Sequence, residues 1–158
     1  MHTELNAQEQ CLRSPAQPGP AAMRDRLTVR IACDADVMGA RQRGRELAGH
    51  LAFPAGDQTV IAAAISEIGR NIIRHADRGE MEFHVVENGD RSALTVIARD
   101  EGPGIADLEL AMQDGYSTAD GRGLGLPGAR RLMDEFQIDS IPGTGTTVTM
   151  KKWRGVHG

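Results

Sequence analysis

Residues 57–76 read DQTVIAAAISEIGRNIIRHA, and this stretch is the strongest evidence in the sequence for the fold. Four isoleucines follow one another at spacings of four, three and four residues, which is the apolar stripe of an amphipathic helix. They are Ile61, Ile65, Ile68 and Ile72. Glu67 and Asn71 lie four residues apart and therefore share another face of the same helix. The stretch predicts a helix from about Asp57 to Ala76 with one buried side.

The segments next to this helix predict a strand, a second helix and a hairpin. Residues 27–33 alternate between apolar and polar side chains, as in a strand, and Asp34 is a suitable N-cap for a helix that runs to about residue 52. After the central helix, residues 81–87 and 93–99 have β-rich composition and are separated by Asn88-Gly89-Asp90. An Asn-Gly pair between two strand patterns favours a tight hairpin.

The rest of the sequence adds two helices and a final hairpin. A short helix is expected at 108–112, and a longer one with Pro127 in its first turn is expected to continue to about Phe136. Residues 137–141 and 146–153 are expected to pair as two strands. This order predicts an α+β fold of two layers, a mixed sheet with helices on one face.

Composition excludes several classes of protein. The chain has 158 residues, 40% of them apolar and 25% charged, which is typical of a globular domain. A net charge of -4 argues against nucleic acid as the main partner, and no apolar run is long enough to cross a membrane. The N-terminus lacks a secretion signal, so we expect a cytoplasmic protein. Residues 1–23 are expected to be a disordered extension and 24–154 the functional domain.

Glu67 and Asn71 are candidates for the chemistry of phosphoryl transfer. A carboxylate can accept a hydroxyl proton, and an amide oxygen can ligate Mg²⁺. The alternative interpretation is that both are solvated side chains on an exposed helix face.

Asp100 ends a predicted strand and opens the motif Asp100-x-Gly102-x-Gly104. Its carboxylate can accept a hydrogen bond from the exocyclic amine of adenine, and the glycines let the following backbone pass close to a nucleotide. An ordinary turn after a strand would have the same composition.

Two further motifs could contact a nucleotide. Before a predicted helix stands Gly121-Arg122-Gly123-Leu124-Gly125-Leu126. Free amides at a helix N-terminus favour anions, so this segment can hold a triphosphate, although a flexible loop has the same sequence features. Thr146 opens the last strand and can reach a purine through water, but a β-branched residue in a strand needs no special reason.

The order of these four motifs resembles the nucleotide-binding boxes of the Bergerat-fold ATPases (GHKL superfamily), which include gyrase, histidine kinases and MutL. The resemblance extends over about residues 27–153. Several strings are more specifically similar to the RsbT type of stressosome kinase, a small kinase that phosphorylates anti-sigma-factor antagonists. These strings are ARQRGRELA at 40–48, DQT at 57–59, DGYST at 114–118 and GLGLPGARRLMDEF at 123–136.

The resemblance implies a role for each candidate residue. Glu67 becomes the general base, Asn71 the Mg²⁺ ligand and Asp100 the adenine contact, while Thr146 completes the adenine end. The residues implied to shape or line the nucleotide loops are Gly102, Gly104, Gly121, Arg122, Gly123, Leu124 and Gly125. Because Asp120-Gly121-Arg122 departs from the family's pattern, Arg122 either clamps the triphosphate or faces solvent.

The resemblance also implies a reaction and its partners. The γ-phosphoryl group of Mg-ATP moves to a serine or threonine of a STAS-domain protein (RsbS/RsbR-like), and the released kinase activates a PP2C-type phosphatase. Neither nucleic acid nor membrane is an expected partner. Two alternatives stay open: a binding module that acts by sequestration, and an anti-sigma factor with kinase activity.

Overall fold

The computed structural model describes residues 26–88, 90–113 and 125–155. The expected extension at 1–23 lies outside these ranges, and so do four of the predicted site residues. These four are Gly121, Arg122, Gly123 and Leu124.

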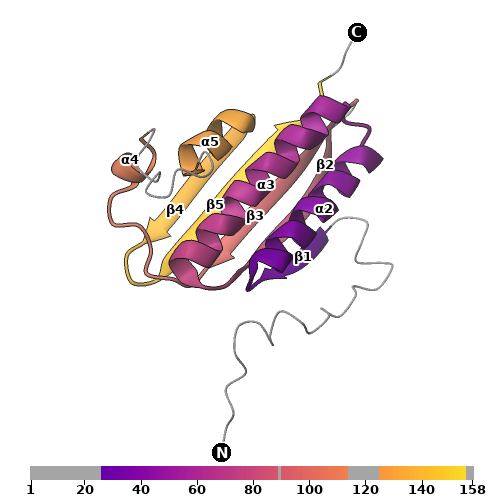
Figure 1. Cartoon of the computed structure of the whole chain (residues 1–158). Coiled ribbons are helices and arrows are strands. Elements are labelled where there is room, and N and C mark those ends of the chain that lie inside the picture. Colours follow the sequence, from indigo (N-terminus) through magenta and orange to yellow (C-terminus); the bar gives the residue numbers. More distant parts are fainter. Residues whose placement is uncertain (1–25, 89, 114–124, 156–158) are drawn as a thin grey trace, which may run out of the picture.

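The described chain forms strands and helices in the order that the sequence predicts (Figure 1). They are β1 (Arg26–Ile31), α2 (Asp34–His50), α3 (Ala55–Ala76), β2 (Gly79–Asn88), β3 (Arg91–Asp100), α4 (Leu108–Ala111), α5 (Gly125–Leu132), β4 (Glu135–Ile141) and β5 (Gly145–Trp153).

The strands form one sheet in the order β1-β2-β3-β5-β4, and every neighbouring pair is antiparallel. The expectation of a mixed sheet is therefore wrong. β4 runs in the same direction as β3, but β5 pairs with both of them and lies in between. If β4 were next to β3, the two strands would pair in parallel. With β5 between them, the β3–β5 and β5–β4 pairs are both antiparallel.

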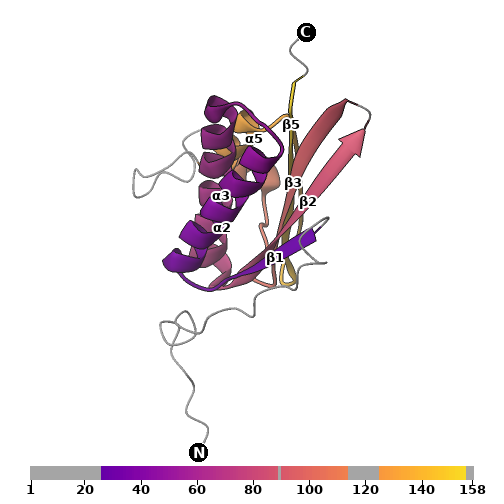
Figure 2. The ribbon, with the colours of Figure 1, turned by 90° about the vertical axis from the view of Figure 1, so that its right-hand side faces the viewer.

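The helices cover one face of the sheet, so the predicted two-layer α+β architecture is confirmed (Figure 2). α3 lies across the middle of this face, and its isoleucine stripe is buried with exposed fractions of 2% or less. The strands contribute the other half of the core through Met81, Phe83, Val96 and Met150. The periodicity of residues 57–76 therefore identifies the core face of the helix correctly.

Several predicted helix ends differ from the observed ones by a few residues, and two of the differences have a physical reason in the contacts. The helix expected to reach Phe136 ends at Leu132, because Glu135 and Phe136 pair with β5 as the start of β4. Asp34 is the first residue of α2 rather than its cap; the carboxylate of Asp36 instead accepts a hydrogen bond from the Ala32 N–H at 2.8 Å. Within the described ranges, no helix has both the length and the apolarity needed to span a bilayer.

Candidate nucleotide site

Asp100 and Thr146 meet at one end of the sheet. They face each other across β3 and β5, in the same alternating rows as the buried residues Ala98 and Val148. Because side chains alternate along a strand, both therefore belong to the helix-covered face. Thr146 is buried, with an exposed fraction of 6%.

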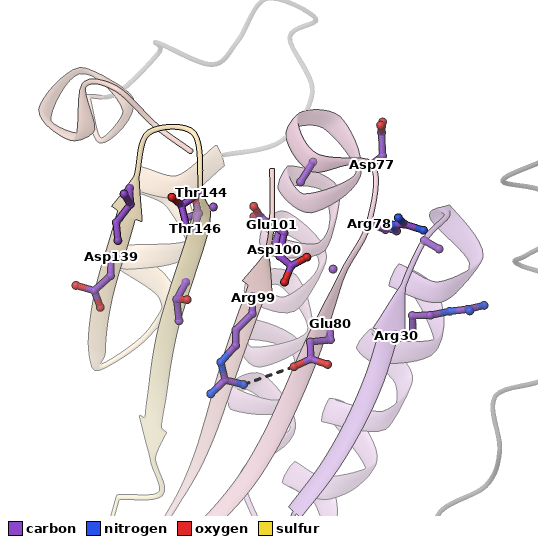
Figure 3. A pocket seen from close by; sticks show the side chains of 16 residues that line it. Arg30, Asp77, Arg78, Glu80, Arg99, Asp100, Glu101, Asp139, Thr144 and Thr146 are labelled. Carbon is purple, nitrogen blue, oxygen red and sulfur yellow. Dashed lines mark ion pairs between the residues drawn. The ribbon is translucent and has the colours of Figure 1, made fainter. Parts of the chain in front are cut away.

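A cavity of about 980 Å³ opens at this end of the sheet (Figure 3). Asp100, Thr144 and Thr146 lie on one part of its wall, and Ala76 at the end of α3 lies on another. The cavity also extends around the sheet end to Glu80 and Arg99, which form an ion pair at 3.8 Å. Its volume is within the range of sites for small molecules and cofactors.

The two glycines after Asp100 hold the following loop against its neighbours. The Asp100 Oδ1 accepts a hydrogen bond from the Gly102 N–H at 3.0 Å, and a Cβ on Gly102 would lie 2.6 Å from the Ala76 Cβ. Gly104 has a φ of 73°, and a Cβ there would lie 2.4 Å from the Ile141 carbonyl oxygen. A side chain is strained at such a φ and is excluded by such contacts. Unlike an ordinary turn, this loop therefore requires glycine at both positions.

The turn between β4 and β5 fixes the same loop from the other side. The Gly143 N–H donates to the Pro103 carbonyl oxygen at 2.7 Å. The Ile105 N–H donates to the Ser140 Oγ, also at 2.7 Å. No local sequence pattern marks Ser140 as part of this site, since Ile105 and Ser140 are 35 residues apart.

Glu67 is held in place by two contacts. Its side chain is only 12% exposed, its Oε1 forms an ion pair with the Arg70 guanidinium at 2.9 Å, and its Oε2 accepts a hydrogen bond from the Gly125 N–H at 2.9 Å. The interpretation of Glu67 as a solvated surface residue is therefore wrong. Gly125 is the first residue of α5, so this hydrogen bond joins α3 to the end of the glycine-rich segment.

Asn71 is half-buried one helical turn beyond Glu67 on α3. Neither Asn71 nor Glu67 lines the cavity, whereas Ala76, further along the same helix, does. At 1.5 Å per residue, Glu67 lies about 13 Å from Ala76 along the helix axis. The Asp100–Thr146 pair thus lies near the C-terminal end of α3, and Glu67 lies closer to the middle of that helix.

Arg99 links the cavity to a cluster of charges on the sheet face that the helices do not cover. It forms an ion pair with Glu82, whose carboxylate also contacts Arg26 and His84. The hydrogen bond from Arg99, followed by the contacts of His84 and Arg26, holds the pKa of Glu82 below its usual range, although burial acts in the opposite direction. Glu82 is 3% exposed and stays ionised at neutral pH.

The described residues fit a nucleotide better than an isolated metal ion. Asp100 and Thr146 offer oxygen atoms at the cavity end, where an adenine amine needs acceptors. No group of three or more His, Cys, Asp or Glu side chains among these residues could hold a metal. Mg²⁺ is commonly held by one or two protein oxygens together with phosphates and water, which fits a single amide ligand such as Asn71.

The sequence is similar to several known proteins. Residues 32–152 match the model of the histidine kinase-like ATPase domain. The serine/threonine-protein kinase RsbT of Bacillus subtilis is 45% identical over 131 residues, which are 83% of this chain and 98% of that protein. The anti-sigma F factor of a Thermoanaerobacter species is 35% identical over 101 residues, 60% of this chain and 69% of that protein.

A solved structure is similar in fold. It contains the RsbU and RsbW domains of a Mycobacterium tuberculosis protein and superposes with a TM-score of 0.50 at 22% sequence identity. The match covers 80% of this chain and 32% of that one.

Proposed function

The chain belongs to the histidine kinase-like ATPases and is a serine/threonine-protein kinase of the RsbT type, and on that premise we propose that it phosphorylates a STAS-domain protein in a partner-switching stress pathway. The donor is the γ-phosphoryl group of ATP, and the acceptor is a serine or threonine hydroxyl. The observation that carries the proposal is the hydrogen bond between Glu67 and Gly125 at 2.9 Å. It brings the only carboxylate of the Glu-x-x-x-Asn motif to the segment where a triphosphate would bind.

In this proposal the two ends of the nucleotide have different partners. Asp100 and Thr146 hold the adenine, and the loop of Gly102 and Gly104 gives its backbone a close approach. The triphosphate extends along α3 toward Gly125, the described end of the glycine-rich motif whose sequence also includes Gly121, Arg122, Gly123 and Leu124. Bound Mg²⁺ would neutralise phosphate charge there, with the Asn71 amide oxygen as its protein ligand.

Glu67 accepts the proton of the substrate hydroxyl at a carboxylate oxygen. As that proton leaves, the hydroxyl oxygen bonds to the γ-phosphorus, and the bond to the bridging oxygen of ADP breaks. Arg70 and the Gly125 N–H fix the direction of the carboxylate, so that little rotational freedom is lost when substrate arrives. In this proposal Glu67 is necessary for phosphate transfer but not for nucleotide binding.

Replacing Glu67 tests this division. We expect Glu67→Gln to bind ATP with nearly unchanged affinity but to transfer phosphate about 10²–10⁴-fold more slowly, because the base is lost while the adenine contacts remain. The measurements are ATP binding by calorimetry and phosphate transfer to a purified RsbS/RsbR-like STAS protein. Glu46→Gln is a matched control, since Glu46 also pairs with an arginine three residues away, Arg43, but lies on α2. A wild-type rate for Glu67→Gln would overturn the assignment.

Partner exchange is the second part of the proposal. A phosphate adds about -1.5 to -2 charges to the STAS surface and would weaken its complex with the kinase. The released kinase would then be available to a PP2C-type phosphatase in the cytoplasm, where ATP is supplied. Glu67→Gln should therefore remain bound to the STAS protein in the presence of ATP, and gel filtration with and without ATP measures this.

Two alternative functions stay open, and the similarity to anti-sigma F factors favours the second. If the wild-type chain binds its partners but transfers no phosphate, it acts as a binding module by sequestration. If it transfers phosphate and also captures a sigma factor in the same gel-filtration assay, it is an anti-sigma factor with kinase activity.

A further inference from the structure

The hydroxyl of Ser140 has three partners beside the adenine end of the proposed site. Ser140 lies on β4 directly opposite Thr146 on β5. Its Oγ is 2.7 Å from the Ile105 backbone nitrogen, 2.8 Å from the Thr146 Oγ1 and 3.3 Å from the Gly145 carbonyl oxygen. The proposed contact between Thr146 and adenine does not explain why Ser140 makes these three contacts.

The chemistry of the three partners fixes the direction of each hydrogen bond. A serine hydroxyl has one proton to donate and two lone pairs that accept. The Ile105 N–H can only donate, so it takes one lone pair of Ser140, and the Gly145 carbonyl can only accept, so it takes the proton. Thr146 must then donate its own proton to the second lone pair of Ser140. All three contacts are satisfied in this arrangement.

The consequence for Thr146 is that its oxygen can only accept hydrogen bonds from a molecule in the cavity. Asp100, which faces Thr146 across the strands, also presents an acceptor, because a carboxylate oxygen accepts hydrogen bonds and, among the described residues, Gly102 engages its Oδ1. Two side chains of the cavity wall thus present acceptors, and neither presents a donor. The 6-amino group of adenine has two hydrogens to give, whereas the 6-oxo group of hypoxanthine or guanine has none.

We propose that Ser140 is a specificity-determining residue that selects 6-aminopurine over 6-oxopurine nucleotides by holding the Thr146 hydroxyl as an acceptor. The inference rests on the proposed ATP site. Ser140 does not touch the nucleotide itself; it acts through Thr146. Without Ser140, the Thr146 hydroxyl is released to rotate and can donate to a 6-oxo group.

The test compares ATP with inosine triphosphate, which differs at the 6-position and lacks the 2-amino group of GTP. Calorimetry gives the Kd of each nucleotide for the wild type and for Ser140→Ala. We expect the wild type to bind ATP more tightly than inosine triphosphate. In Ser140→Ala the ratio of the Kd for inosine triphosphate to the Kd for ATP should fall about tenfold, the effect of one hydrogen bond near a charged neighbour. Both nucleotides also lose affinity if the Ile105 contact matters, so the ratio of the two Kd values is the decisive quantity.

Two further variants separate specificity from structure. Ser66→Ala removes another serine hydroxyl, which donates to the Ala62 carbonyl inside α3, and should leave the ratio unchanged. Thr146→Val removes the hydroxyl that Ser140 orients, so it should lower the ratio of the two Kd values by itself. Adding Ser140→Ala to this variant should then change the ratio no further.

The outcomes distinguish this inference from the proposed function. If the wild type binds neither nucleotide, the proposed function fails. If the wild type binds ATP but Ser140→Ala keeps the full preference, the inference is overturned and the ATP site stands. Should Ser140→Ala fail to fold, Thr146→Val decides, because an unchanged ratio in that variant also overturns the inference.

Discussion

A few side chains of this protein each have a distinct task at the proposed site. Asp100 both accepts the Gly102 N–H and faces the cavity, and Glu67 joins two elements through its two oxygens. Each carboxylate is therefore fixed by the protein before any ligand arrives. Such fixed groups lose little freedom on binding, which is how a small domain can hold a flexible nucleotide.

Replacing Asp100 should weaken ATP binding. In Asp100→Asn the side chain keeps an oxygen for the Gly102 N–H but loses the negative charge that faces the adenine amine. We expect a loss of about 1.5–3 kcal/mol in binding, the contribution of a hydrogen bond to a charged group. Calorimetry on the folded variant measures it.

Asp139→Asn is the control for this prediction. Asp139 also lines the cavity, but its carboxylate accepts a hydrogen bond from Gln137 on β4. Its replacement should leave the affinity for ATP nearly unchanged. Equal losses for the two variants would mean that Asp100 acts only through the general charge of the cavity.

Among the elements, the β4–β5 turn is the one that shapes the adenine end. Gly143 of this turn and Ser140 at the end of β4 contact the loop after β3, and Ile141 packs on Gly104. The pairing of β4 with β5 therefore determines the shape of a loop that comes more than 30 residues earlier in the sequence. None of these contacts is local.

A pair of glycine variants can isolate this packing. Gly104 and Gly143 both have a positive φ, but a Cβ on Gly104 would collide with Ile141, whereas a Cβ on Gly143 meets open space. We expect Gly143→Ala to cost about 1 kcal/mol of stability from its φ alone. Gly104→Ala should cost more and also weaken ATP binding, because the loop must move.

Urea unfolding and ATP calorimetry on both variants measure the difference. The interpretation fails if Gly104→Ala is as stable as Gly143→Ala and binds ATP with wild-type affinity.

The sequence predicted the elements of this fold well and their ends less well. Periodicity found α3 and its buried isoleucines, since both depend on neighbours within the helix. The helix predicted to reach Phe136 ends earlier, and no local pattern shows that Glu135 and Phe136 pair with β5. Asp100 and Thr146 belong to recognisable motifs and stay predicted site residues. Arg70 has a local signal that the motifs do not include, its i,i+3 spacing to Glu67. Ser140 has none, because its partner Ile105 lies 35 residues away.

Viewed as a whole, the molecule has a sheet with two different faces. The helix-covered face is apolar, and the other face carries a cluster of charges around Glu82. Arg26, His84 and Arg99 contact this carboxylate from three positions on β1, β2 and β3, and Arg99 also forms an ion pair with Glu80. The cluster joins the first three strands through ion pairs, in addition to the apolar packing on the opposite face.

This cluster predicts how stability depends on pH. The pKa of Glu82 is lowered in the folded state, so its contribution is present above the unfolded value of about 4.3 and is lost as the pH falls through the lower folded value. Glu82→Gln should therefore cost about 2 kcal/mol at pH 7 and progressively less below pH about 4. Thermal unfolding of both proteins across this range measures the difference.

Glu87→Gln provides the comparison, because Glu87 is exposed on the same strand. It should change stability little at any pH. A loss for Glu82→Gln that stays constant down to acidic pH would contradict the role of its charge.

The place of β5 between β3 and β4 also governs when a newly made chain can begin to work. Synthesis proceeds in sequence order, so the ribosome releases β4 before the strand that joins it to β3. Until residues 145–153 follow, Asp100 faces no threonine and the loop after it has only part of its support. A product that stops before residue 145 therefore lacks the Thr146 side of the proposed adenine site, and we expect it not to bind ATP.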